Sequence, residues 1–168
     1  KNLAEELRAK GINAEYVTFT NVFAHIEDLN SLCEAVNLIT DEKSLIVIEN
    51  HYMKAIIEKK QFDTFYHEHP RTYSAKSFKY IAEKLNKELL FIEFPERYGG
   101  NIRCFIGKRK YHELLPPLEM PNEDKFFSTI TGLQSSIQVW KSKCLKMIDD
   151  LILKNNGLAI PAKAFPGR

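Results

Sequence analysis

Cysteine is scarce in this sequence, and the residues that are present lie far apart. The three cysteines are Cys33, Cys104 and Cys144, and no Cys-x-x-Cys pair occurs. This pattern supports neither a structural zinc knuckle nor a disulfide framework. We therefore expect reduced, mostly buried thiols in a cytoplasmic protein, and we predict no metal site in the chain.

Long apolar runs and an excess of one charge are also lacking. No run approaches the length needed to cross a membrane, and the first residues do not resemble a signal peptide. The 24 Lys and Arg residues nearly balance the 22 Asp and Glu residues, and the basic residues are spread along the chain. We therefore expect a cytoplasmic protein that binds neither nucleic acid nor membrane.

Glycine-rich loops that hold phosphate groups are a third absence. Neither the dinucleotide pattern Gly-x-Gly-x-x-Gly nor the Walker pattern occurs. The chain has 168 residues, enough for one buried domain or for one domain with part of another. It opens at Lys1 within a helix-like segment and stops near residue 168 where a strand and loop would begin, so we expect a piece of a larger protein.

Helical and strand patterns alternate along the first part of the chain. Apolar spacing predicts helices at residues 2–10, 28–38, 52–60 and 74–85, and strands at 15–19, 44–49, 88–94 and 101–107. The apolar run at 44–49 is typical of a strand buried on both faces of a parallel sheet. The last two strands, joined through Pro95 and Gly99-Gly100, are typical of an antiparallel hairpin. This order predicts an α/β domain.

A proline-rich segment precedes a long helical pattern. Pro116, Pro117 and Pro121 mark residues 111–122 as a linker. A single amphipathic helix is predicted from residue 123 to residue 154. Its expected apolar stripe consists of Phe126, Phe127, Ile130, Leu133, Ile137, Trp140, Leu145, Ile148 and Leu151.

Four consecutive side chains that can move protons or bind metal stand at residues 66–69. They are Tyr66, His67, Glu68 and His69. Imidazole has an unperturbed pKa of about 6.5, and a neighbouring carboxylate or phenol can shift that pKa or fix the tautomer. The segment therefore indicates a general acid/base site. The His-x-His spacing also suits a metal ion, and a structural histidine pair bonded to the backbone is a further alternative.

Two more groups of polar residues stand at the ends of predicted strands. Asn21 and His25 follow the strand that ends near Thr20, where ligands bind in open α/β sheets, although His25 can equally pack against the next helix. The hairpin turn offers backbone N–H groups, an amide and a guanidinium, which suit a phosphate or a sugar hydroxyl. Its residues are Tyr98, Gly99, Gly100, Asn101 and Arg103, and a plain glycine turn is the structural alternative.

Four blocks in a fixed order resemble one family. They are Thr20-Asn21-Val22-Phe23-Ala24-His25-Ile26, Phe62-Asp63-Thr64-x-Tyr66-His67-Glu68-His69 with Tyr73-Ser74, Tyr98-Gly99-Gly100-x-x-Arg103, and Pro161-Ala162-Lys163. Their order and spacing, from about residue 12 to the C-terminus, resemble the S-adenosylmethionine-dependent sugar C-methyltransferases, which make branched deoxysugars on nucleotide carriers. The first two blocks are specific to this family. The other two are weak signals alone and support the resemblance through their order in the chain.

The resemblance implies an architecture for the chain. The family has an N-terminal zinc-binding domain, a Rossmann-type class I methyltransferase domain and a C-terminal Rossmann-like domain. Against that template, residues 1–110 resemble the second half of the methyltransferase domain, with part of its sheet and an antiparallel hairpin. Residues 123–168 resemble the long helix and the start of the C-terminal domain. The family's zinc-binding cysteines and the Gly-rich loop for S-adenosylmethionine would precede Lys1, so we expect this fragment to be inactive alone.

The resemblance also assigns roles to residues. The base that removes a proton beside a keto group is implied to be His69, supported by Glu68 and Tyr66, with His25 in the same site. Thr20 and Asn21 are implied to contact the cofactor, and Asn21 also the small-molecule sugar substrate. Further substrate contacts are expected from Arg71, Tyr98, Gly99, Gly100, Asn101 and Arg103.

One departure from the family leaves the substrate open. The segment Pro70-Arg71-Thr72 stands where many members carry apolar and aromatic residues, and Arg71 can meet a different anionic substrate. The sugar, and carbon against oxygen methylation, therefore stay open. Two other functions remain as alternatives: a nucleotide-sugar-binding module without chemistry, and a metal-dependent hydrolase that uses His67 and His69.

Overall fold

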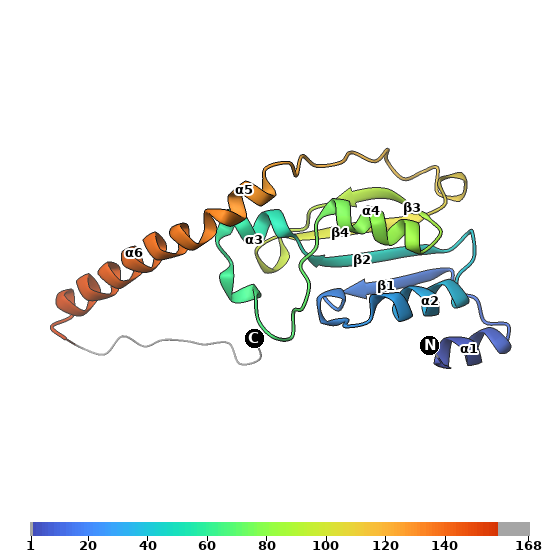
Figure 1. Ribbon diagram of the computed structural model, residues 1–168, viewed down its shortest axis with the longest axis horizontal. Helices are drawn as coiled ribbons and strands as arrows, with labels where there is room; N and C mark the ends of the chain where they lie inside the picture. The colour runs from blue at the N-terminus through green and yellow to red at the C-terminus, as the bar shows by residue number, and fades with distance from the viewer. Residues whose placement is uncertain (1, 158–168) are drawn as a thin grey trace. The chain divides into compact units, whose positions relative to one another are not determined.

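The computed structural model describes residues 2–157 (Figure 1). Contacts along the chain divide it into two compact units, residues 1–127 and 128–168, which are described separately. The block at 161–163 and the expected start of a C-terminal domain lie outside the described residues. Within residues 2–157, no helix is both long and apolar enough to span a membrane.

A four-stranded mixed sheet forms the centre of the first unit. Its strands are β1 (Tyr16–Thr20), β2 (Leu45–His51), β3 (Glu88–Glu93) and β4 (Asn101–Gly107), in the order β1-β2-β4-β3. β1 and β2 are parallel, whereas β4 runs antiparallel to both β2 and β3. The α/β class and the hairpin are thus confirmed. The prediction that 44–49 lies within a parallel sheet is wrong for one side of β2, because the returning hairpin strand pairs there.

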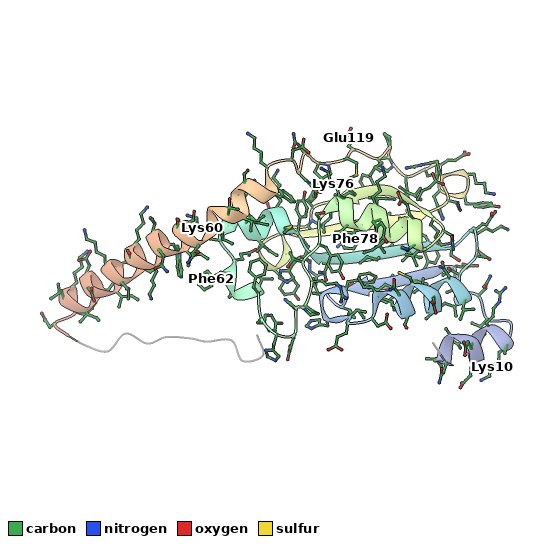
Figure 2. The ribbon with its side chains drawn as sticks, in the orientation of Figure 1. Lys10, Lys60, Phe62, Lys76, Phe78 and Glu119 are labelled. Atoms are coloured by element: carbon green, nitrogen blue, oxygen red, sulfur yellow. The ribbon has the colours of Figure 1, made fainter. Side chains whose placement is uncertain are left out.

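One face of the sheet carries the hydrophobic core. The register places Ile46 and Ile48 of β2 beside Ile106 and Cys104 of β4, and all four are 0% exposed. Helices α2 (Leu29–Ile39) and α4 (Ala75–Lys84) pack in the same core cluster through side chains such as Val36 and Phe78. Figure 2 labels Phe78, which is also fully buried. Burial of so many aliphatic groups is the main stabilising contribution to this unit.

The opposite face of the sheet has a different composition. Val47, Glu49, Phe105 and Arg103 alternate with the core residues along β2 and β4, so they point to this side. The Phe105 ring contacts the Phe91 ring of β3 at 5.6 Å between centroids. A charged pair, Glu49 and Arg103, therefore lies on this face, near the carboxyl end of β2.

The remaining elements of the first unit are short. They are α1 (Asn2–Ala9), α3 (Met53–Lys59) and the 3-10 turns η1 (Phe23–His25), η2 (Phe62–Thr64), η3 (Arg97–Gly99) and η4 (Arg109–Tyr111). Residues 65–73, between η2 and α4, contain no helix and no strand apart from a bridge between Tyr73 and Tyr52. The four side chains at 66–69 thus lie in a loop.

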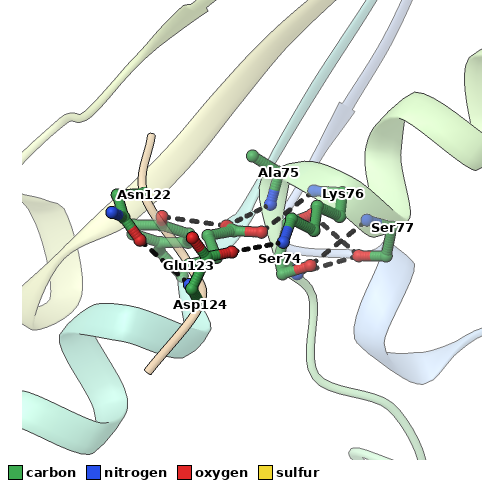
Figure 3. Close-up of polar contacts among 8 residues, drawn as sticks. Ser74, Ala75, Lys76, Ser77, Asn122, Glu123 and Asp124 are labelled. Carbon is green, nitrogen blue, oxygen red and sulfur yellow. Dashed lines mark hydrogen bonds and ion pairs between the residues drawn. The ribbon is translucent and has the colours of Figure 1, made fainter. Parts of the chain in front are cut away.

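The N-terminus of α4 is capped twice. Ser74 and Ser77 form a capping box, in which each side chain bonds the backbone N–H of the other. The carboxylate of Glu123 accepts hydrogen bonds from the backbone N–H of Ala75 at 2.7 Å and of Lys76 at 3.2 Å (Figure 3). The same carboxylate accepts the Tyr52 O–H at 3.0 Å. Glu123 is 6% exposed, so a residue expected to begin the long helix instead holds another helix in place.

The predicted single helix at 123–154 is wrong in its start and its continuity. Two helices are present, α5 (Phe126–Thr131) and α6 (Leu133–Lys154), with Gly132 between them. Glycine weakens a helix because its backbone loses the most freedom on ordering. α6 lies in the second unit, and Trp140, Leu145 and Ile148 of the predicted stripe are exposed on it.

Candidate active site

His69 is held by two hydrogen bonds within its own loop. Its Nδ1 lies 3.0 Å from the carbonyl oxygen of Thr64, and its Nε2 lies 3.1 Å from the hydroxyl of Tyr66. The backbone N–H of His69 also donates to the carbonyl of Tyr66 at 2.9 Å. These contacts span five residues of sequence, so the loop itself positions the imidazole.

The hydrogen bonds of His69 define its tautomer. A carbonyl oxygen only accepts, so Nδ1 must carry the proton that it donates to Thr64. Nε2 of the neutral ring then has a lone pair, and the Tyr66 O–H donates to it. Nε2 is therefore the basic nitrogen of His69, and in this structure it accepts the hydrogen bond of the Tyr66 hydroxyl.

The environment of His69 favours its neutral form. Burial lowers the pKa of His69 below its ordinary value of 6.5, and the neighbouring His25 lowers it further. The hydrogen bond to Thr64 and the charge of Glu68 act in the opposite direction but do not outweigh burial. An imidazole with a lowered pKa stays unprotonated at neutral pH, which is the state that a general base needs.

Three imidazoles gather at the carboxyl ends of β1 and β2. The ring of His69 lies 4.6 Å from that of His25 and 5.9 Å from that of His51, between centroids. His25 belongs to η1 just after β1, so the structure brings it next to His69, and its role in a reaction stays a prediction. His51 was not among the site residues predicted from the sequence. Its position as the last residue of a buried strand is the signal that could have identified it.

The metal-site alternative for His67 and His69 depends on a third ligand nearby. Among residues 2–157, no group of three or more His, Cys, Asp and Glu side chains has an arrangement that could hold a metal ion. His67 is 88% exposed in its side chain and lies 3.9 Å from the Glu68 carboxylate, which is itself 59% exposed. The two histidines of the His-x-His pattern therefore differ, because only His69 joins the other imidazoles.

Arg71 and Tyr73, which follow His69 in the chain, connect this loop by hydrogen bonds to the segment after β1. The guanidinium of Arg71 donates to the carbonyl of Ile26 through one nitrogen and to that of Glu27, at 2.7 Å, through another. Tyr73 is 3% exposed, its O–H donates to the Phe23 carbonyl at 3.0 Å, and burial raises its pKa to about 12. Arg71 thus supports the loop, and its contact with an anionic substrate stays a prediction.

A polar network centred on Glu49 lies beside the histidines. The Glu49 side chain is 3% exposed, its carboxylate accepts a hydrogen bond from Arg103 Nε at 2.8 Å, and Arg103 Nη2 forms an ion pair with it at 2.6 Å. Asn101 Nδ2 donates to the same carboxylate at 2.8 Å, and Arg97 lies 3.8 Å away. Burial opposes ionisation, but the hydrogen bonds and charges of these partners prevail and lower the pKa of Glu49. Sequence patterns did not indicate this long-range network.

The turn before β4 adopts conformations that favour glycine. Gly99 has φ +86° and Gly100 has φ +130°, and a Cβ on Gly100 would lie 2.6 Å from that of Ala55. Tyr98 also has a positive φ of 51°, and its ring stacks on the His51 ring at 6.1 Å. The turn therefore brings Tyr98 to the histidines and Asn101 to Glu49. Whether these residues contact substrate stays a prediction.

A cavity of about 260 Å³ is lined in part by Gly100 and Asn101 of this turn. Its walls include Tyr52, Phe94 and Pro121, with Gly100 and Asn101 at the boundary with the polar network. Lys59 at the cavity also approaches Gly100, since its Nζ lies 3.9 Å from where a Cβ would stand. The turn thus contributes residues both to the polar network and to this cavity, whose lining combines aromatic and charged side chains.

Comparison with known proteins supports the motif-based interpretation. The chain is similar to the C-methyltransferase NovU of Streptomyces niveus, with 26% identity over 125 residues. The matched region covers 73% of this chain and 30% of that protein, so the chain spans less than a third of its relative. No family model matches the chain. The similarity confirms the resemblance to C-methyltransferases that the sequence blocks predict.

Proposed function

We propose that this chain provides the proton-abstracting part of a methyl-transfer site. The acceptor would be a keto sugar on a nucleotide carrier, and the methyl donor S-adenosylmethionine. One observation carries the proposal: His69 Nδ1 lies 3.0 Å from the carbonyl oxygen of Thr64, an acceptor that leaves Nε2 as the basic nitrogen of the neutral ring. The similarity to a C-methyltransferase supports methyl transfer as the reaction class.

The proposed base acts on a C–H bond next to the keto group of the sugar. His69 Nε2 takes the proton, the electron pair of the C–H bond forms an enolate, and the enolate carbon becomes the nucleophile. Tyr66 leaves Nε2 as the substrate enters, and its O–H then becomes available to the oxygen that gains negative charge. His69 afterwards returns its proton to water, so the base is regenerated.

Residues at the end of β1 fit part of the methyl donor. The chemistry supplied by S-adenosylmethionine is an electrophilic methyl group, and the electrons of its S–C bond stay on sulfur. Thr20 is exposed and Asn21 follows it directly, so both offer polar groups at the edge of the sheet where cofactors bind in α/β folds. We assign these two residues to the cofactor and the turn at residues 98–103 to the sugar.

The first test replaces the proposed base in the native protein as its gene encodes it. His69→Ala should lower the rate of methyl transfer by about 10²- to 10⁴-fold, because a positioned base contributes that much. Affinity for S-adenosylhomocysteine, measured by calorimetry, should stay within about threefold of the native value, since a loss of one base does not remove cofactor contacts.

His67→Ala is the matched control, because this histidine stands in the same loop with its side chain 88% exposed. Its turnover should stay within about twofold of the native rate, as expected for a surface substitution. Equal turnover in His69→Ala and the native protein would contradict the proposed base. Cofactor binding without any methyl transfer by the native protein would favour a binding module.

A further inference from the structure

Glu49 is a buried charged group that the proposed chemistry does not use. It stands near the end of β2, followed by Asn50, His51 and the bridge residue Tyr52. Burying a carboxylate costs several kcal/mol unless other groups compensate the charge. The compensation here comes from Arg103 at one carboxylate oxygen, and from the amide of Asn101 and the approach of Arg97 at the other.

The network fixes which way the Asn101 amide points. Its Nδ2 donates to Glu49 Oε1 at 2.8 Å and to Asn21 Oδ1 at 3.2 Å. Both partners are acceptors, so a flipped amide would place oxygen against oxygen at two contacts. Asn101 Oδ1 is thereby left as an acceptor, and within the described residues this buried atom has no hydrogen-bond partner.

The same network holds the residue that follows β1. The backbone N–H of Asn21 donates to the Glu49 carbonyl at 2.8 Å, and Asn21 has a positive φ of 53°. Asparagine tolerates this left-handed conformation better than most residues, but it still needs contacts that hold it there. Glu49 therefore contacts, through its carboxylate or its carbonyl, Asn21 and Asn101 from two separate elements.

The histidine cluster lies directly beside these contacts. His51 and Asn101 are cross-strand partners in the register of β2 and β4. Arg97, which approaches Glu49, also lies over the Tyr98 ring at 5.6 Å, and Tyr98 stacks on His51. A shift of Glu49 would thus reach the cluster by two routes, through the β4 backbone and through the Arg97–Tyr98 pair.

We propose that Glu49 is a positioning residue of this site, which orients Asn101 so that its Oδ1 accepts a hydrogen bond from a hydroxyl group of the substrate. The inference rests on the proposed methyl transfer to a sugar. Glu49 itself touches neither substrate nor cofactor, because both of its carboxylate oxygens already accept hydrogen bonds, from Asn101 and Arg103. Asn101, in contrast, also lines the neighbouring cavity. The orientation of Asn101 depends on the direction of this hydrogen bond, in which Asn101 donates and Glu49 accepts.

The test reverses that polarity one partner at a time. Glu49→Gln places an NH₂ group against the Asn101 NH₂ group, and Asn101→Asp places a carboxylate against Glu49. Each single variant should lower turnover by about tenfold or more, the size of coupling seen between residues in one network. In the double variant Glu49→Gln/Asn101→Asp, the glutamine donates to the aspartate, so the contact re-forms with its charge retained.

The double variant should therefore regain at least about fivefold in turnover over either single variant, within the coupling range for contacting residues. Rates are measured below the unfolding temperature of each variant, so a general loss of fold cannot mimic the recovery. Glu93→Gln is the matched control, because Glu93 bonds the other side of Arg103 and does not contact Asn101. Its turnover should stay within about threefold of native, as for most surface positions.

The outcomes separate this inference from the proposed function. Absence of methyl transfer to keto sugars by the native protein contradicts the proposed function itself. With an active native protein, additive losses in the double variant, or a Glu49→Gln variant as fast as the native protein, would overturn the positioning role. Recovery in the double variant, with Glu93→Gln near the native rate, is the result that the inference requires.

Discussion

The loop that holds His69 and the helix that follows it are neighbours in sequence but differ in how they are stabilised. In residues 62–69, Phe62, Phe65 and His67 are exposed, and the hydrogen bonds of His69 stay within the loop. From Ser74 onward the chain has two caps at the N-terminus of α4 and a fully buried Phe78. The proposed chemistry thus lies in a weakly packed segment next to a rigid one.

This difference suggests a division of roles. A base must release Tyr66 and accept a substrate proton, so its surroundings need hydrogen bonds that can exchange. The helix and its Glu123 cap need no such exchange, and their burial gives the loop a fixed end at Tyr73. Substitutions in the helix cap should therefore change stability more than rate, and substitutions in the loop should do the opposite.

The largest stability effect should come from removing the cap on α4. Glu123→Ala leaves the buried N–H of Ala75 and the Tyr52 hydroxyl without their acceptor, which should cost about 1–3 kcal/mol of unfolding free energy. Urea denaturation measures this loss. The control is Asp124→Ala, because the Asp124 carboxylate is 76% exposed and its ion pair with Lys76 lies at the surface. A loss of less than about 0.5 kcal/mol is expected for it, and equal losses would contradict the distinction.

An intermediate effect on rate should follow from Tyr66→Phe. This change removes the O–H that bonds His69 Nε2 but keeps the ring, whose centroid lies 4.2 Å from that of His69. Turnover should fall by about tenfold, equivalent to one hydrogen bond of about 1.4 kcal/mol. Stability should change by less than about 1 kcal/mol, because the side chain is only half-buried. A large loss of stability with no change in turnover would contradict a role of Tyr66 in the proposed reaction.

The smallest effect concerns stability against pH. The pKa of His69 is lowered in the folded protein, so the unfolded chain takes up this proton more readily. Its contribution to stability is therefore present above pH of about 6.5 and is lost as the pH falls below that value. Between pH 7 and pH 5, the urea midpoint of the native protein should fall more than that of His69→Gln. Equal falls would show that His69 is not held in its neutral form.

Much of the local structure could be predicted from the sequence. The helices at 2–10, 28–38 and 74–85 and the four strands follow periodicity, and the structure places each within a few residues. The four side chains at 66–69 could be recognised in the sequence as a candidate acid/base site because they are consecutive. What separates His67 from His69 within it, exposure against burial, depends on the fold and could not be derived from spacing.

Long-range contacts account for what the sequence did not reveal. Glu49 appeared only as the end of an apolar strand, and Glu123 as the start of a helix, because their partners stand 47 to 71 residues away. The antiparallel pairing of β2 with β4 likewise depends on the path of the hairpin. A buried carboxylate needs partners, but nothing in a local pattern tells which residues provide them.

Proton exchange in D₂O tests the central claim most directly, because it isolates the step assigned to His69 from methyl transfer. The native protein with bound S-adenosylhomocysteine should replace the C–H proton next to the keto group of the sugar with deuterium, as mass spectrometry would detect. His69→Ala should slow this exchange by at least about 10²-fold, the usual contribution of a general base, whereas His67→Ala should exchange at the native rate. Exchange at the native rate in His69→Ala would contradict the assignment of His69 as the base.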